Sequence, residues 1–157
     1  LDFNIFDFKE EMKGSELATL TTMLFEKHDL FKSCKINNSK FLNFVIAIQR
    51  GYKNVAYHNK THGTDVAQTL YFFLMKGEWM TKGDMDNLDL LSMIIGGCVH
   101  DYEHPGYNAA FLMKTNDTLA VRYNDISILE NHHIAATFEH LNKTENNIFE
   151  KFTDDDK

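Results

Sequence analysis

The stretch Val99-His100-Asp101-Tyr102-Glu103-His104-Pro105-Gly106 decides how the rest of the chain is interpreted. Residues 88–99, directly before it, form a nearly uncharged apolar run. A membrane-spanning helix needs about 20 apolar residues, so this run predicts a buried helix. The His100–Asp101 pair then lies at the inner end of that helix, where ionisable side chains are costly unless they are paired or bind a metal. An imidazole and a carboxylate are common ligands of a divalent ion, although a buried histidine satisfied by its neighbour is the favoured reading of the pair in isolation.

The overall composition indicates one globular domain, covering residues 1–157. Of the 157 residues, 43% are hydrophobic and 25% are charged, which suits a single core. The net charge of −7 argues against nucleic-acid binding, which needs basic patches. It does not argue against an anionic substrate, because a bound metal can supply the local charge. The sequence also predicts neither a signal peptide nor a membrane span.

The two cysteines indicate a cellular compartment, and the chain ends indicate the extent of the protein. Cys34 and Cys98 are far apart in the sequence, and we interpret both as reduced core thiols of an intracellular, cytoplasmic protein. Residues 1–3 do not resemble a natural start, so we expect a longer protein. The acidic tail at 153–157 is predicted to be a solvated loop.

Apolar residues recur at helical spacing through most of the chain. Ser15 is a plausible N-cap, Asn38–Ser39 and Asn124–Asp125 are further cap candidates, and Gly51 and Gly77 are natural C-terminal stops. Residues 3–8 alternate apolar and polar side chains, which predicts a short strand or an extended lead-in. We see no set of paired strands and expect a compact all-α domain of about seven to nine helices. The candidate helices cover residues 15–31, 38–51, 57–75, 88–99, 109–113, 119–121 and 124–138.

Six of the eight histidines fall in three short clusters. His58 and His62 are four residues apart, a spacing that places both on one face of a helix and allows two imidazoles to hold one ion. The second cluster is His100 with His104. The third, residues 130–133, has a glutamate beside two histidines, a combination that can hold metal-bound water or orient a ligand.

Each cluster also has an ordinary explanation. The spacing in the first arises often by chance, and the third is compatible with a solvated helix face. Three such clusters in one small domain nevertheless predict a common metal site. The two remaining histidines, His28 and His140, are assigned to ordinary surface or core positions.

Together, these segments resemble the N-terminal half of the catalytic domain of class I 3',5'-cyclic-nucleotide phosphodiesterases. Residues 25–31 resemble the end of an early helix of that family. Residues 57–66, from Tyr57-His58-Asn59 through His62 to Asp65-Val66, resemble its Tyr-His-Asn-x-x-His-Ala-x-Asp-Val segment. Residues 100–106 resemble its His-Asp signature, and residues 123–133 resemble its Tyr-Asn-Asp…Leu-Glu-Asn-His-His stretch. The match runs nearly end to end, in the family's order.

The resemblance implies an all-α fold of the HD-type phosphohydrolase class. It also implies metal-dependent hydrolysis of 3',5'-cyclic nucleotides, cAMP and/or cGMP, to nucleoside 5'-monophosphates. Two divalent ions are implied, Zn²⁺ at the first site and Mg²⁺ or Mn²⁺ at the second, with an attacking hydroxide between them.

Individual roles follow from the resemblance, position by position. The ligands of the first ion would be His62, His100 and Asp101, with Asp101 also bridging to the second. His58 would be the general acid that protonates the departing O3', beside Tyr57 in the nucleotide site. His104 and Glu130 would hold waters on the second ion. His132 and His133 would support the site from outside the ligands.

The sequence departs from the family pattern in three respects. Gly63 stands where alanine is usual, and Ala109 stands where asparagine is usual, with Asn108 one place early. The chain also lacks the family's remaining aspartate ligand and the glutamine and aromatic clamp that hold the base. We therefore expect the domain to be incomplete on its C-terminal side and this half alone to be inactive.

Two alternatives remain at this stage. A catalytically incompetent, phosphodiesterase-like subunit with a structural or regulatory role is suggested by the missing half and Ala109, but the intact ligand set argues against it. Another metal-dependent phosphohydrolase of the wider His-Asp class is disfavoured by the segment from Tyr57 to His62. A dimer or larger assembly would form through segments that this sequence does not contain.

Overall fold

The computed structural model describes residues 3–153, and within this range the chain is helical with no strand. The all-α prediction is therefore confirmed, with ten helices where about seven to nine were expected. Residues 154–157, most of the predicted solvated tail, lie outside the described part, as do residues 1–2. The helices are α1 (Ile5–Met12), α2 (Glu16–Lys27), α3 (Leu30–Ser33), α4 (Asn38–Gly51), α5 (Lys60–Lys76), α6 (Trp79–Lys82), α7 (Asn87–Val99), α8 (Ala109–Lys114), α9 (Thr118–Arg122) and α10 (Ile128–Leu141).

Three local predictions are corrected by where the helices begin. Within the expected strand or extended segment at residues 3–8, residues 5–8 instead form the start of α1, because the Asn4 side chain accepts hydrogen bonds from the backbone of Phe6 and Asp7 and caps the helix. Helix α5 begins at Lys60 and not at residue 57, because Asn59 is its N-cap. Helix α10 begins at Ile128, after a turn of residues with positive φ, and not at residues 124–125.

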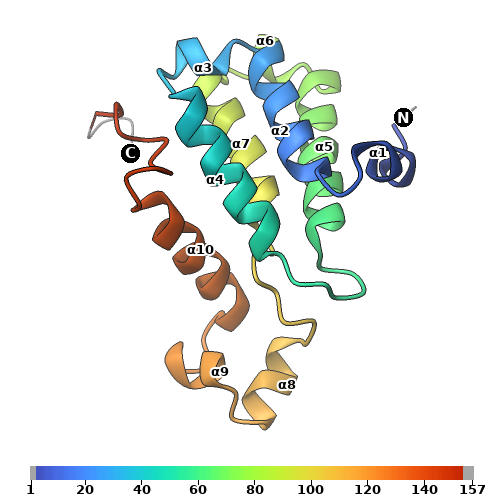
Figure 1. The fold of residues 1–157 in the computed structure, drawn as a ribbon, viewed down its shortest axis with the longest axis vertical. Coiled ribbons are helices and arrows are strands. Elements are labelled where there is room, and N and C mark those ends of the chain that lie inside the picture. The colour runs from blue at the N-terminus through green and yellow to red at the C-terminus, as the bar shows by residue number, and fades with distance from the viewer. Residues whose placement is uncertain (1–2, 154–157) are drawn as a thin grey trace.

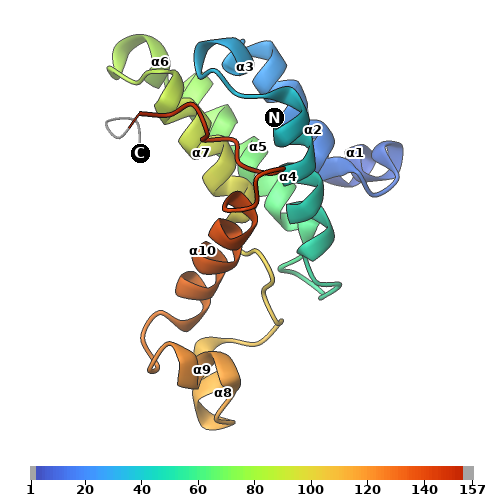
Figure 2. The ribbon, with the colours of Figure 1, turned by 60° about the vertical axis from the view of Figure 1, so that its left-hand side comes forward.

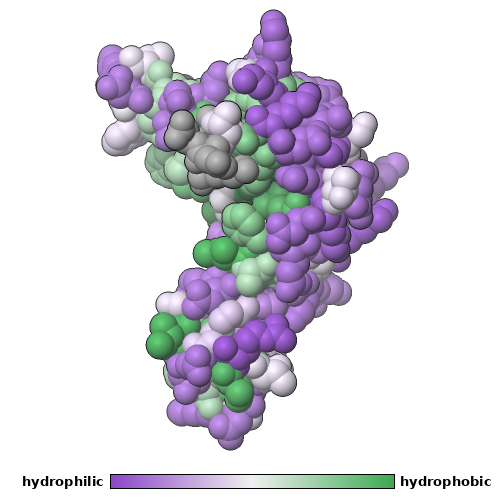
Figure 3. Space-filling model, turned by 90° about the vertical axis from the view of Figure 1, so that its left-hand side faces the viewer, coloured by the Kyte–Doolittle hydropathy of each residue, from purple (hydrophilic) through white to green (hydrophobic). Residues whose placement is uncertain are grey.

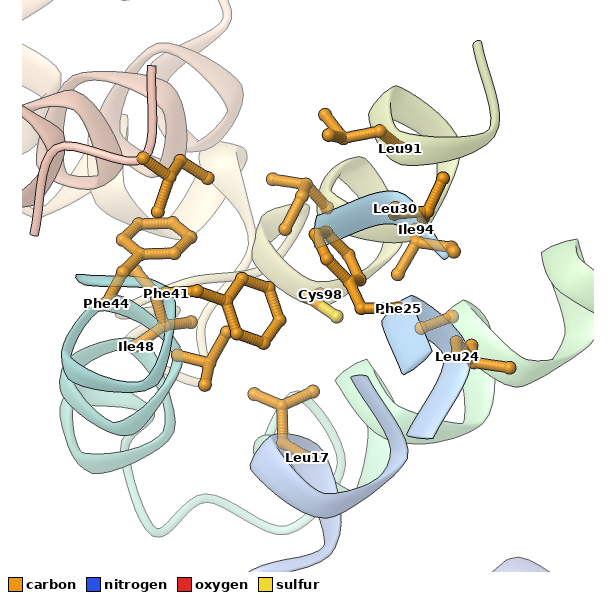
Figure 4. Close-up of a cluster of buried hydrophobic side chains, with 14 of the residues drawn as sticks. Leu17, Leu24, Phe25, Leu30, Phe41, Phe44, Ile48, Leu91, Ile94 and Cys98 are labelled. Carbon is orange, nitrogen blue, oxygen red and sulfur yellow. The ribbon is translucent and has the colours of Figure 1, made fainter. Parts of the chain in front are cut away.

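Four longer helices form the main bundle. Helix α5 packs along α7, and α2 packs against both α4 and α5 (Figure 1). Their inward faces supply large buried side chains, of which Figure 4 shows a part. The largest fully buried ones in this core are Leu17, Phe25, Leu30, Phe41, Phe44, Ile48, Leu90, Ile94, Tyr102 and Ile148.

The contact between α5 and α7 is unusually close at one point. A Cβ atom built on Gly97 would lie 2.8 Å from the Cα atom of Ala67 and 3.2 Å from its backbone nitrogen. Only a residue without a side chain fits there. Because His62 lies in α5 and His100 directly follows α7, this contact helps to fix the spacing of the site.

A second, smaller core lies outside the bundle. It is formed by Leu112 of α8, Ala120 of α9 and Ile128 at the start of α10. Figures 1 and 2 show α8, α9 and this end of α10 projecting away from the bundle. Large hydrophobic residues are exposed on this projection, including Phe111, Val121 and Ile126, and Figure 3 shows separate apolar patches among polar surface on the lower part of one face. We call α8, α9 and the first turns of α10 the outer lobe.

No helix among the described residues is both long enough and apolar enough to cross a membrane.

Candidate metal centre

The first ligand segment is placed by the N-cap of α5. The Asn59 side-chain oxygen accepts hydrogen bonds from the backbone nitrogens of Thr61, at 3.0 Å, and His62, at 3.3 Å. Its amide donates to the carbonyl of Val55 at 2.9 Å, which folds the preceding segment back against the helix. His62 therefore lies in the first turn of α5 and His58 lies before the helix. The prediction that these two histidines share one helix face is wrong, because the cap separates them.

The second segment is placed by the end of α7. His100 is the C-cap residue of that helix, and its Nδ1 lies 2.8 Å from the carbonyl oxygen of Gly97. A carbonyl oxygen only accepts, so Nδ1 donates, and the proton on Nδ1 leaves the lone pair of Nε2 free to bind a metal. Such a second hydrogen bond is the usual way in which a ligating histidine is oriented.

The three predicted ligands of the first ion meet at this end of the bundle. The Nε2 atoms of His62 and His100 lie 3.2 and 3.1 Å from Oδ2 of Asp101, and 3.2 Å from each other. In a tetrahedral zinc site with bonds of about 2.0–2.1 Å, neighbouring ligand atoms lie about 3.3 Å apart. The triangle therefore has nearly the dimensions of one face of such a tetrahedron. His62, His100 and Asp101 form a group that could hold a metal ion.

The charges at this triangle favour a bound cation. Although burial alone would raise the pKa of Asp101, the hydrogen bond from His100 and the nearby imidazoles lower it to about 2. Burial lowers the pKa of His100, but its bonds to Asp101 and Gly97 outweigh burial and raise it. Burial and the neighbouring His100 lower the pKa of His62. One anion with at least one neutral imidazole is a suitable donor set, and a metal would displace the proton of His100.

A second group lies on the other side of Asp101. Ligand atoms of His58, Asp101 and His104 all lie within 4.8 Å of one another, and the rings of His58 and His104 stack at 3.9 Å with an angle of 13°. The Nδ1 atom of His104 accepts a hydrogen bond from the backbone of Gly106 at 3.0 Å, so its neutral form carries a proton on Nε2. Burial and the neighbouring His58 lower the pKa of His104 to about 4. His104 is therefore a neutral donor through Nε2, suited to hold an oxygen atom and unsuited to bind a metal through that nitrogen.

The third predicted cluster is divided by the turn of α10. His133 is buried, its Nδ1 donates to the carbonyl of Tyr102 at 2.6 Å, and its Nε2 lies 3.7 Å from Oδ1 of Asp101. His133 therefore holds the backbone directly after Asp101 in place through its bond to Tyr102. Burial lowers the pKa of His133. Glu130 is exposed in the first turn of α10.

His132 pairs with a residue that the sequence did not single out. Its Nε2 lies 3.0 Å from Oε2 of Glu103, which has a positive φ of 60°. The signal that could have revealed Glu103 is its place two residues after a ligand, in the segment that turns towards α8. The pair ties this segment to α10.

The centre is open on the side of Tyr57. This side chain is 64% exposed, and its ring lies 4.5 Å from the ring of His62 and 4.9 Å from that of His58. A groove of about 650 Å³ lies elsewhere, between α7, α10 and residues 142–152, and none of the predicted site residues lines it.

An all-helical bundle that joins two histidines and an aspartate at one end has the fold of the HD-type phosphohydrolases, as predicted. The family model of the 3'5'-cyclic nucleotide phosphodiesterases matches residues 57–157. The chain belongs to this family, which confirms the resemblance seen in the sequence.

Individual relatives support the same family assignment. The chain is 37% identical over 156 residues to 3',5'-cyclic-AMP phosphodiesterase 4 of Dictyostelium discoideum, covering 98% of this chain and 14% of that protein. It is 34% identical over 157 residues to the human dual specificity calcium/calmodulin-dependent 3',5'-cyclic nucleotide phosphodiesterase 1B, covering 98% of this chain and 29% of that protein.

A solved structure extends the agreement to the fold. The phosphodiesterase domain of the RhoPDE fusion protein from the choanoflagellate Salpingoeca rosetta superposes with a TM-score of 0.87 at 28% identity, over 99% of this chain and 47% of that chain. The chain thus spans less than half of each of these three proteins.

Proposed function

We propose that this chain forms the metal-binding half of a catalytic site that hydrolyses 3',5'-cyclic nucleotides, cAMP and/or cGMP, to nucleoside 5'-monophosphates, as part of a longer protein. The observation that carries the proposal is the triangle of His62, His100 and Asp101, with edges of 3.1–3.2 Å, in a member of this family. A catalytically retired relative would have little reason to keep these buried ionisable groups together.

Two divalent ions complete the proposal. The triangle suits Zn²⁺, which takes histidine nitrogen and carboxylate oxygen in tetrahedral geometry. The second oxygen of Asp101, Oδ1, has His133 at 3.7 Å, beyond hydrogen-bonding distance, so it could bridge to Mg²⁺ or Mn²⁺. When bound, a pair of ions supplies a nucleophile at neutral pH and neutralises the charge on the phosphate.

The remaining roles belong to protein side chains. His58 is off the triangle, and we assign it as the acid that gives a proton to the departing O3' of the nucleotide. A positioned acid contributes about 10²–10⁴-fold to a rate, and a histidine already bound to a cation would be a poor donor. Tyr57, exposed beside it, is assigned to the nucleotide. His104, with its proton on Nε2, would hold an oxygen of the second ion's shell, and Glu130 and His133 would support that shell from α10.

The test distinguishes the proposed acid, His58, from the proposed metal ligand, His62. In the 157-residue chain, His62→Ala removes one of three ligands. Structural zinc sites with four ligands bind with about 10–16 kcal/mol, or roughly 2.5–4 kcal/mol per ligand, so zinc affinity should fall about 10²–10³-fold. His58→Ala should leave zinc affinity unchanged.

Turnover is then measured on the longer catalytic domain that contains the chain. His58→Ala should lower kcat for cAMP and cGMP, with a much smaller effect on an ester whose leaving group needs no proton. If His58→Ala removes zinc as completely as His62→Ala does, His58 is a ligand and the acid assignment is wrong. If neither variant changes zinc binding, the metal centre is wrong as well.

A further inference from the structure

Tyr52 connects the two helices that carry the candidate ligands. It follows α4 as the C-cap residue and is buried, with 8% of its surface exposed. Its hydroxyl donates a hydrogen bond of 2.8 Å to the carbonyl oxygen of Cys98. Cys98 lies in the last turn of α7, two residues before His100, so this bond holds the end of the helix from which His100 and Asp101 project.

The same side chain lies directly against α5. A Cβ atom built on Gly63 would lie 2.8 Å from the hydroxyl oxygen of Tyr52 and 3.0 Å from the ring carbon that bears it. The φ of Gly63 is not in the left-handed region, so an alanine here would act through its close approach to Tyr52, whose side chain would have to shift. Gly63 directly follows His62. Tyr52 therefore packs against Gly63, the residue after His62. It also donates a hydrogen bond to the backbone of Cys98, just before His100 and Asp101.

Tyr52 also contacts the segment after the ligands. Its ring packs edge-on against the ring of Tyr102, with centroids 5.9 Å apart at 80°, and Tyr102 directly follows Asp101. The carbonyl of Tyr102 accepts the bond from His133. Backbone on both sides of the His100–Asp101 pair thus depends on the position of this ring.

We propose that Tyr52 is a positioning residue that, together with Gly63, sets the distance between His62 and the His100–Asp101 pair. The inference rests on the metal centre proposed above and adds to it a part of the machinery that touches neither metal nor substrate. A tyrosine that only filled core volume would stabilise the fold without adjusting the site, which is the alternative to be tested.

The matched experiment deletes single hydroxyl groups from the chain. Tyr52→Phe removes the bond to Cys98 and keeps the ring. Tyr71→Phe is the control, because that hydroxyl lies 3.0 Å from Nε2 of His28 and comes from α5 itself. Zinc affinity is measured by competition with a chromophoric chelator. Groups that orient ligands typically change metal affinity about 10–100-fold, so Tyr52→Phe should weaken zinc at least about tenfold and Tyr71→Phe less than about twofold.

Gly63→Ala supplies a second, independent perturbation. It should displace the Tyr52 ring and weaken zinc by a similar factor. Because both changes break one contact, the double variant Tyr52→Phe/Gly63→Ala should resemble either single variant and not show the product of the two effects. Multiplying effects, or equal zinc affinity in Tyr52→Phe and Tyr71→Phe, would overturn the proposal.

A metal-free readout keeps this test separate from that of the function. The imidazole C–H resonances of His62 and His100 should shift in Tyr52→Phe and in Gly63→Ala, and stay in place in Tyr71→Phe. If these shifts occur while the unaltered chain fails to bind zinc, the positioning role stands, and the three ligands of this chain are too few to hold the ion without the family's remaining aspartate. If the resonances do not move, the positioning role is refuted whatever zinc does.

Discussion

Two adjacent glycines in α7 should respond in opposite directions to the same substitution. At Gly97, an added methyl group would lie 2.8 Å from Cα of Ala67 and 3.1 Å from Cδ1 of Leu70. Cα belongs to the backbone of α5, so the strain can be relieved only by moving a helix. At Gly96, which is exposed, nothing lies within 4 Å of the new atom.

The magnitudes follow from two competing effects. Replacing glycine by alanine inside a helix gains about 0.5–1 kcal/mol, whereas overpacking a tight contact costs about 1–3 kcal/mol. Gly96→Ala should therefore raise the free energy of unfolding by about 0.5–1 kcal/mol. Gly97→Ala should lower it by about 1–2 kcal/mol.

Urea unfolding measures both variants, with an unchanged m-value as the condition for comparing them. Since α5 and α7 carry His62 and His100, Gly97→Ala should also weaken zinc binding, and Gly96→Ala should not. Two variants of equal stability, or a stabilised Gly97→Ala, would show that the α5–α7 contact is not tight and that its spacing does not fix the site.

Three further outcomes are expected. Asn59→Ala should lower the free energy of unfolding by about 0.5–2 kcal/mol and weaken zinc binding. Asn37→Ala, which removes the equivalent cap of α4, should cost a similar amount of stability and leave zinc binding intact. Equal zinc affinities in the two variants would contradict the inference that the Asn59 cap places His62. Burial and the neighbouring Lys27 lower the pKa of His28, so the folded state resists protonation and stability should fall as the pH drops below about 6.5. His28→Gln should make that part of a urea-unfolding pH profile less steep, and an unchanged slope would refute the assignment. Zinc at 100 times its dissociation constant should raise the free energy of unfolding by about 2.7 kcal/mol. A chelator should reverse this stabilisation, and His100→Ala should abolish it. If the stabilisation persists in His100→Ala, zinc binds elsewhere.

The sequence was most informative where one physical signal dominated. The apolar run at residues 88–99 allowed only a buried helix, and α7 occupies residues 87–99. Short segments were ambiguous, because residues 3–8 fit a period of two as well as they fit the start of a helix. The start of α5 was placed too early because the helical spacing continues through His58, while the backbone follows the Asn59 cap.

The residues of the candidate centre could be named from the sequence, but their geometry could not. That His62 meets Asp101 depends on how closely α5 crosses α7, and this is decided by glycines that local patterns do not distinguish. The Gly63 departure illustrates the difficulty. In the sequence it was only a small loss of helix propensity, whereas the structure shows the Tyr52 ring in the space that an alanine would occupy.

The division into two cores has a consequence for how this protein can vary. The three groups of the triangle come from the first turn of α5, the C-cap residue of α7 and the residue after that C-cap, all on the side of the large core. The outer lobe has its own small core and is tied to this side by pairs such as that of His132 with Glu103. Substitutions in α8 and α9 can therefore reshape the surface beyond the metal centre while leaving the ligand spacing intact. Selection could therefore change the surface of the outer lobe and the ligands of the metal centre almost independently of each other.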